Sequence, residues 1–269
     1  MTDTPPTAPE HAPAPQLEGA KGRRSTSGTS TPVLAGAAIA ISAAALILAG
    51  LPYLGVGVGP HVRGYLLNNP QILDEMLEAR QIAEEQNATS AIDSAVAANP
   101  NLLAADPRDP AVGPQDAKVT VIQFFDYRCP GCKAVAGPYR EMMDRHPEVR
   151  FVFKEWPILD NGSTVTSNYA ARAALAAHAQ GKYIQVHNAL MAERALNEAA
   201  IDAILQEAGV DMAKARAAMT APETVRHITD IHTIGTALRL RGTPTFFVNG
   251  KTSASIDPAE VEKMIEAAK

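Results

Sequence analysis

The chain has 269 residues, and its 24 lysines and arginines against 29 aspartates and glutamates give a net charge of −5. This acidic balance argues against nucleic-acid binding, which favours a basic surface. The two cysteines are too few for a framework of several disulfides, and the scarcity of aromatic residues in an alanine-rich chain favours helices over an all-β fold.

Residues 1–31 are rich in Pro, Thr, Ala, Ser and Gly and have almost no large apolar side chains. Such a segment cannot bury enough apolar surface to offset the entropy lost on folding. We therefore expect a disordered cytoplasmic tail, whose basic cluster is Lys21, Arg23 and Arg24.

Residues 32–59 contain no charged residue, and their central stretch, 33–51, is predominantly apolar. About 20 apolar residues suffice for a helix to cross the hydrocarbon core of a bilayer. Basic residues precede the run and the next one is Arg63, so the positive-inside rule places everything after the run outside the cytoplasm. We predict a single-pass inner-membrane anchor with the remaining chain in the periplasm. The alternative is a cleaved signal peptide, with a small-residue site such as Ala43, Ala44 and Ala45, that leaves a soluble periplasmic protein.

Residues 60–105 carry an amphipathic helical pattern interrupted near Asn69 and Pro70. The apolar stripe comprises Val62, Tyr65, Leu66, Ile72, Leu73, Met76, Leu77 and Ile82. A short helix of this kind needs an apolar partner, and we expect that partner to be a second copy of the chain. Packing on the chain's own domain or on the membrane surface is the alternative. Residues 97–114 have turn-forming Pro and Asp without periodicity, which predicts a linker.

Residues 115–269 have the pattern of one α/β domain. Strands are predicted at 119–125 and 149–156, with a helix between them that ends near His146. A long alanine-rich insertion over about 163–240 predicts helices at 163–179, 182–192, 197–208, 212–219 and 222–240. The turn Asn249-Gly250 after 246–248 indicates a hairpin. The last helix, 258–267, begins behind Asp257, a suitable N-cap.

Both cysteines lie in the motif Cys129-Pro130-Gly131-Cys132, where the strand 119–125 gives way to a helix. The thiolate is the reactive form of cysteine, and the free N–H groups and dipole of a helix N-terminus stabilise its charge. Pro130 suits the first helical turn, where its missing N–H costs nothing. We predict a redox pair in which Cys129 is the exposed attacking sulfur and the inward-facing Cys132 is the resolving sulfur.

Two flanking cations, Arg128 and Lys133, are expected to lower the pKa of Cys129 further. A structural zinc site is the competing interpretation, but it needs four ligands, and His227 and His232 lie far from the cysteines in the sequence. A permanent disulfide over so small a loop would stabilise little. No metal site is therefore predicted.

The order of elements matches a thioredoxin fold with an inserted helical subdomain, and the chain resembles the DsbA-like family of exported thiol-disulfide oxidoreductases. The matching sequence motifs are Phe124-Phe125-Asp126-Tyr127, Phe153-Lys154-Glu155-Trp156-Pro157-Ile158-Leu159, Ala170-Ala171-Arg172-Ala173-Ala174, Gly181-Lys182-Tyr183 and Gly242-Thr243-Pro244-Thr245-Phe246. Residues 62–73 are similar to the N-terminal helical region of the branch that includes the copper-sensitivity suppressor ScsC, a region associated with oligomerisation in some members.

The resemblance implies that Thr243-Pro244 is a cis peptide that faces the cysteines and docks substrate. A cis peptide bond costs least before proline. The alternative is an ordinary loop with a trans bond. It also places Glu155 near the active site, where a carboxylate could carry a proton to Cys132, unless Glu155 is a surface charge. Strongly oxidising members often have His at the position of Gly131, so this disulfide is expected to be less oxidising.

The implied function is oxidation or isomerisation of disulfides in exported cysteine-containing proteins, without a bound cofactor. A membrane redox partner, DsbB-like or DsbD-like, is expected to reset the pair. The alternative is a periplasmic copper-tolerance protein that holds Cu(I) between its two thiolates. The sequence leaves the direction of electron flow open.

Overall fold

The computed structural model describes residues 31–50, 58–161 and 166–269, except for the side chains of residues 31–38, 58 and 60. The predicted disordered tail lies almost entirely outside these residues, as does part of the predicted anchor, residues 51–57. The chain divides into two compact units, Met1–Leu73 and Asp74–Lys269, and each is described by itself.

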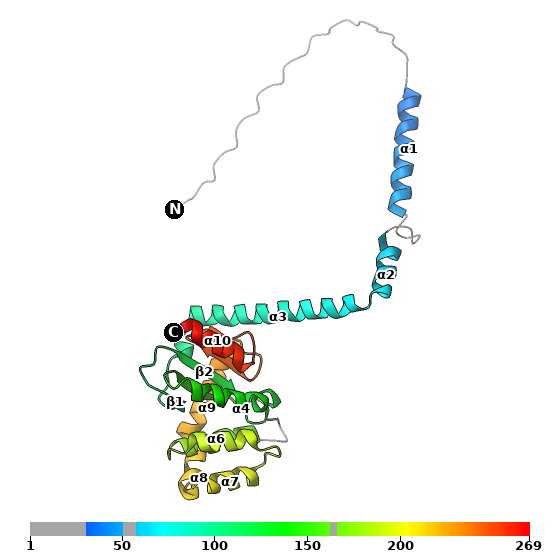
Figure 1. Cartoon of the computed structure of the whole chain (residues 1–269). Helices are drawn as coiled ribbons and strands as arrows, with labels where there is room; N and C mark the ends of the chain where they lie inside the picture. Colours follow the sequence, from blue (N-terminus) through cyan, green and yellow to red (C-terminus); the bar gives the residue numbers. More distant parts are fainter. Residues whose placement is uncertain (1–30, 51–57, 162–165) are drawn as a thin grey trace, which may run out of the picture. The chain divides into compact units, whose positions relative to one another are not determined.

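The described residues of the first unit are mainly helical. Helix α1 covers Thr31–Gly50 and α2 covers Val58–Asn68, and α3, Gln71–Ala98, begins at the end of this unit (Figure 1). The predicted interruption near residues 69 and 70 is confirmed: Pro70 has no N–H to continue the helix, and Asn69 Nδ2 donates to Tyr65 O at 2.8 Å. Across the described parts of the chain, no helix combines the length and apolarity needed to span a bilayer.

The second unit is built on a sheet whose described strands run in the order β1-β3-β2-β4-β5. The strands are β1 Ala111–Val112, β2 Thr120–Phe125, β3 Arg150–Glu155, β4 Thr245–Val248 and β5 Lys251–Thr252. Strands β2 and β3 are parallel and the other pairings are antiparallel. The parallel pair requires a crossover connection, which α4, Pro130–Arg145, supplies.

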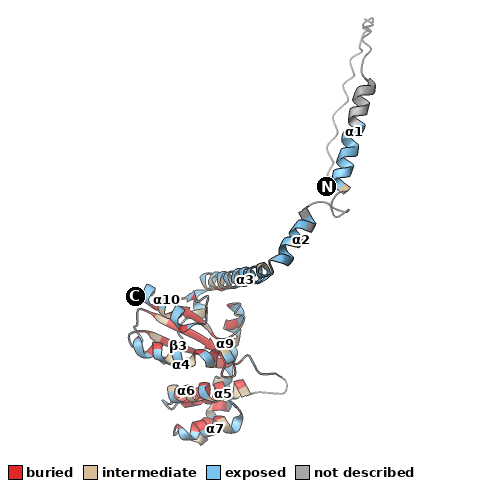
Figure 2. Ribbon diagram, turned by 45° about the vertical axis from the view of Figure 1, so that its right-hand side comes forward, coloured by how far each residue is buried: buried red, intermediate tan, exposed pale blue. Residues whose placement is uncertain are grey.

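Alternation along the strands divides the core between the two faces of the sheet. Val121, Phe125 and Phe153 point to the face that packs against α4, α10 (Pro258–Ala268) and the helical insertion. The other face carries Ile231 of α9 (Pro222–Ala237) and Ile92 of α3, together with the strand-side residues Ile122, Phe124, Val152, Trp156 and Phe247. Figure 2 shows buried residues concentrated in this sheet and its covering helices. The two central strands are therefore buried on both faces, and they carry the buried polar side chains of Gln123, Lys154 and Glu155 as well as apolar ones.

The helical insertion consists of α5 Thr166–His178, α6 Tyr183–Ala192, α7 Glu198–Glu207, α8 Met212–Thr220 and α9 Pro222–Ala237. All five predicted helices are present within a few residues of their expected bounds; residues 163–165, where the first was expected to begin, lie outside the described residues. The predicted N-cap is also confirmed, because Asp257 accepts the N–H of Ala259.

The linker predicted over residues 97–114 is wrong. The segment contains a 3-10 helix, η2, Pro100–Leu103, and the edge strand β1, in which Ala111 pairs with Val152. Two residues are too few to show a strand's periodicity. The preceding helix is also part of the domain: Ile92 is buried, and Asp93 Oδ1 accepts the N–H of Thr252 in β5 at 3.0 Å.

Candidate active site

The two cysteines lie where β2 ends and α4 begins. Cys129 is the N-cap residue of α4 and Pro130 occupies its first turn, as predicted. Cys129 N–H donates to Asp126 O at 3.1 Å. The buried Asp126 carboxylate fixes this turn by accepting the N–H groups of Arg128 and Leu159 at 2.7 and 2.9 Å. The cysteine pair is therefore held by a rigid turn.

Both cysteines are free and buried. Cys129 is 8% exposed and Cys132 is fully covered. The expected order of accessibility is present, but Cys129 is not the exposed sulfur that the sequence suggested, since Thr243 and Pro244 of the facing loop lie against the motif. Attack through Cys129 therefore depends on a substrate that fits the surface around that loop.

The environment separates the two thiols. A hydrogen bond from Cys132 is the largest influence that lowers the pKa of Cys129 to about 5, helped by Thr243 and by the N–H groups of Cys132 and Gly131, and opposed by burial. The same bond to Cys129, together with burial, raises the pKa of Cys132 far above its ordinary value. At neutral pH the pair thus consists of one thiolate and one thiol, as nucleophilic exchange requires.

The two flanking cations do not have the predicted role. Arg128 Nη1 donates to Leu159 O at 2.9 Å and lies 3.6 Å from Asp160 Oδ1. Lys133 Nζ donates to the carbonyl oxygens of residues 190, 191 and 193. Neither charge is among the main causes of the low Cys129 pKa, because each side chain is directed to other acceptors.

The Thr243–Pro244 peptide bond is cis, as the resemblance implies, and it lies against the motif. Cys129 Sγ donates to Thr243 O at 3.0 Å, while Thr243 Oγ1 is buried without a hydrogen-bond partner. A thiolate has no proton to donate, and this hydroxyl is then available to donate to it. A Cβ added to Gly131 would lie 3.3 Å from Pro244 Cδ, so the small third residue of the motif permits this close approach.

A groove of about 290 Å³ borders the cis-proline. One wall is formed by residues 241–246 and another by the β5–α10 loop, residues 252–256. The third wall is the second half of α3, through Glu85, Ala88, Thr89 and Ile92. The sequence did not assign α3 to the site, because nothing local indicates which side of the domain a preceding helix covers.

Glu155 is buried beneath the site at the end of β3. Its Oε1 accepts the hydroxyls of Tyr127 and Tyr183, each at 2.9 Å, and Tyr127 Oη lies 3.0 Å from His187 Nδ1. Burial raises the pKa of Glu155 well above its ordinary range and lowers that of His187 to about 3. Within the described residues no hydrogen bond joins Glu155 to either cysteine.

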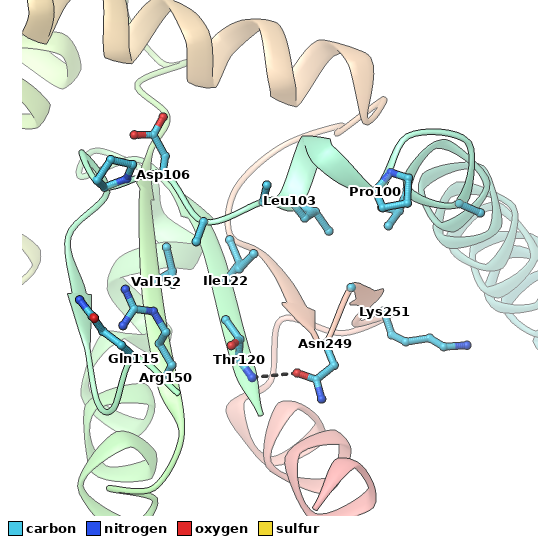
Figure 3. Close-up of a pocket in the computed structure, with 16 residues that line it drawn as sticks. Pro100, Leu103, Asp106, Gln115, Thr120, Ile122, Arg150, Val152, Asn249 and Lys251 are labelled. Carbon is cyan, nitrogen blue, oxygen red and sulfur yellow. Dashed lines mark hydrogen bonds between the residues drawn. The ribbon is translucent and has the colours of Figure 1, made fainter. Parts of the chain in front are cut away.

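A larger cavity, of about 770 Å³, lies at the other end of β2, beside Thr120, Ile122, Arg150 and Val152. Figure 3 shows these side chains with Asn249, whose Oδ1 accepts the N–H of Thr120 at 2.8 Å. The cysteines follow the opposite end of the strand, so this cavity is separate from them. The described residues include no group of three or more His, Cys, Asp or Glu side chains placed to hold a metal ion.

A family model described as Thioredoxin matches residues 105–267. The sequence is 30% identical over 152 residues to the Na⁺/H⁺ antiporter NhaA 3 of Salinispora tropica, which covers 56% of this chain and 23% of that protein. It is 26% identical over 170 residues to NhaA of Herminiimonas arsenicoxydans, covering 61% and 27%. The chain thus spans only about a quarter of the length of these curated relatives.

Solved structures share the fold. A thioredoxin-like oxidoreductase from Silicibacter pomeroyi is 37% identical, with a TM-score of 0.58 that covers 63% of this chain and 97% of that one. The catalytic domain of Proteus mirabilis ScsC is 20% identical, with a TM-score of 0.58 and coverage of 65% and 97%. The thiol-disulfide exchange protein α-DsbA2 of Wolbachia pipientis is 21% identical, with a TM-score of 0.60 and coverage of 67% and 97%. The last two likenesses concern the fold alone.

Proposed function

The chain belongs to the thioredoxin family over residues 105–267, and from this premise we propose that it is a thiol-disulfide oxidoreductase of exported proteins. The observation that supports this proposal best is the unequal cysteine pair at the start of α4. Cys129 has a pKa of about 5, whereas the pKa of Cys132 is raised. One sulfur is thus prepared to attack while the other keeps its proton.

In the reducing direction, the Cys129 thiolate attacks one sulfur of a substrate disulfide. A Cys129–substrate S–S bond forms, the substrate S–S bond breaks, and the departing sulfur leaves as a thiolate that takes a proton from solvent. Cys132 then loses its proton and attacks Cys129 Sγ, which releases the second substrate sulfur and forms the Cys129–Cys132 disulfide. Two electrons pass from the pair to the substrate. The reverse sequence oxidises a substrate dithiol, and both steps together, with release after rearrangement, isomerise disulfides.

The groove beside Pro244 is the proposed binding site for an extended substrate segment. It adjoins Thr243 O, the acceptor of the Cys129 thiol at 3.0 Å. Burial of Cys129 supports this role. Because this sulfur is only 8% exposed, a substrate segment has to dock around it before the two sulfurs can react. Ile92 and Ile256 supply apolar walls, and Glu85 of α3 adds a negative charge.

We further propose that the domain works in the periplasm and is reset by a DsbB-like or DsbD-like membrane partner. The support is the uncharged run over 33–51 behind a basic cluster. Self-association through α2 and α3 is proposed because their apolar stripe is exposed in the single chain. Its exposed members are Val62, Tyr65, Leu66, Leu73, Met76, Leu77 and Ile82.

Trapping of mixed disulfides tests the exchange chemistry. Cys132→Ser leaves the attacking sulfur and removes the resolving one, so we expect it to accumulate covalent complexes with exported proteins. Cys129→Ser, the matched control, should accumulate none. Complexes in equal amounts with both variants would contradict the assigned roles. Alkylation of the cysteines in acid-quenched cells gives the direction: a mostly oxidised pair indicates an oxidase, and a mostly reduced pair an isomerase or reductase.

A further inference from the structure

A second cavity, of about 440 Å³, lies in the helical insertion, between α5, α8 and the segment that precedes α5. Tyr169 and Met219 give it an apolar lining, and Asp160, Arg172 and Arg216 are its charged groups. It shares no residue with the groove beside the cis-proline.

Two of the three charges already have partners. Arg216 binds the Asp202 carboxylate and the Tyr169 hydroxyl. Asp160 accepts the N–H groups of Ser167 and Asn168, each at 2.8 Å, and lies 3.6 Å from Arg128 Nη1. These contacts neutralise both charges.

Arg172 is different. Its Nε is buried and has no hydrogen-bond partner, and the described residues place no salt bridge on its guanidinium. A buried N–H without an acceptor costs free energy. One positive charge with an unused donor therefore borders a cavity that is large enough for a side chain or a small organic ion.

We propose that this cavity is a binding site for a carboxylate, which Arg172 holds through its guanidinium. The planar donors of arginine match the two oxygens of a carboxylate. A single unmatched positive charge fits a monoanion better than a dianion such as phosphate. The Tyr169 ring and Met219 give an apolar surface against which the methylene groups of a glutamate can pack.

The cavity also has a connection to the cysteines. Asp160 is the ion-pair partner of Arg128, which directly precedes Cys129 in the chain. If the proposed function holds, an acidic residue of a bound substrate occupies this cavity while the substrate's cysteine reacts, so acidic sequences are preferred. A small free carboxylate offers the same chemistry, and the experiment separates the two sources.

The test uses cysteine-free probes, so its result does not depend on the redox activity. The probes are a short peptide with one glutamate, the same peptide with glutamine, and the free compound N-acetylglutamate amide. Binding to the full reduced chain is followed through the NMR signal of the Arg172 Nε–H. We expect the glutamate peptide to shift this signal and to bind about tenfold more tightly than the glutamine peptide.

Arg172→Gln should remove that preference, and Arg172→Lys should lose most of it, because lysine keeps the charge but not the planar donors. Arg226→Gln makes the same charge change at an exposed position of α9 and should bind as the native chain does. Binding of N-acetylglutamate amide as tight as that of the peptide would identify a small carboxylate as the ligand, whereas binding of the peptide alone would identify an acidic protein segment. Equal binding of the glutamate and glutamine peptides by the native chain would overturn the proposal, even if the Arg172 variants failed to fold.

Discussion

Removal of the Cys132 thiol should raise the pKa of Cys129. The hydrogen bond from Cys132 is the largest influence that lowers this pKa to about 5. A hydrogen bond to a charged group contributes about 1.5–3 kcal/mol, and each pH unit corresponds to about 1.4 kcal/mol. Cys132→Ala should therefore raise the Cys129 pKa by about 1–2 pH units, leaving Thr243 and the backbone N–H groups to hold it below the ordinary value.

Cys132→Ser is the matched control, since its hydroxyl can still donate to the thiolate, and its effect should be smaller. The ultraviolet absorbance of the thiolate, followed against pH, measures each pKa, with a variant that lacks both cysteines as the baseline. The hydrogen-bond explanation would be refuted by an unchanged Cys129 pKa in Cys132→Ala, or by equal increases in the alanine and serine variants.

The same low pKa predicts how the stability of the reduced protein depends on pH. Folding favours the Cys129 thiolate, so the stabilisation is complete above the unfolded-state pKa of about 8.5 and is lost as the pH falls toward about 5. Within this window the free energy of unfolding should rise with pH by at most about 1.4 kcal/mol per unit. The oxidised protein has no thiolate and should lack this component, as denaturant titrations of both forms at several pH values can show.

Three further predictions concern other parts of the chain. Gly131→Ala should raise KM for a peptide disulfide, because the new Cβ would lie 3.3 Å from Pro244 Cδ. The control is Gly137→Ala, which has open space around it in α4 and should stabilise the protein by about 0.5–1 kcal/mol. Equal KM values for the two variants would argue against a role of the motif glycine in the groove. The raised pKa of the Glu155 carboxyl predicts that the native protein loses stability as the pH rises above about 4.5. Glu155→Gln should keep an acceptor for both tyrosines but abolish this loss. An unchanged dependence of stability on pH in denaturant titrations would exclude Glu155 as the source of the loss. Met76→Glu should reduce the mass found by light scattering, since Met76 is 61% exposed in the single chain and an interface would cover it; Glu75→Gln is the control, and a monomeric native chain would contradict self-association.

The sequence was sufficient where the signal is local. Strands β2 and β3, the five helices of the insertion and the cap at Asp257 follow from periodicity, alanine content and turn residues. The cysteine pair was recognisable for the same reason, because a C-x-x-C motif between a strand and a helix places a sulfur at a helix N-terminus whatever surrounds it.

The tertiary structure decided everything that depends on distant segments. Arg128 and Lys133 are next to the motif in sequence, yet each is bound to another acceptor. The Cys129 pKa is lowered mainly by Cys132, with help from Thr243, which lies far away in the sequence. The groove wall formed by α3 and the pairing of β1 with β3 likewise have no local signature. The local sequence pattern determines which helices and strands form. Which groups a charged side chain, a hydroxyl or a helix face contacts depends on distances that exist only once the chain has folded.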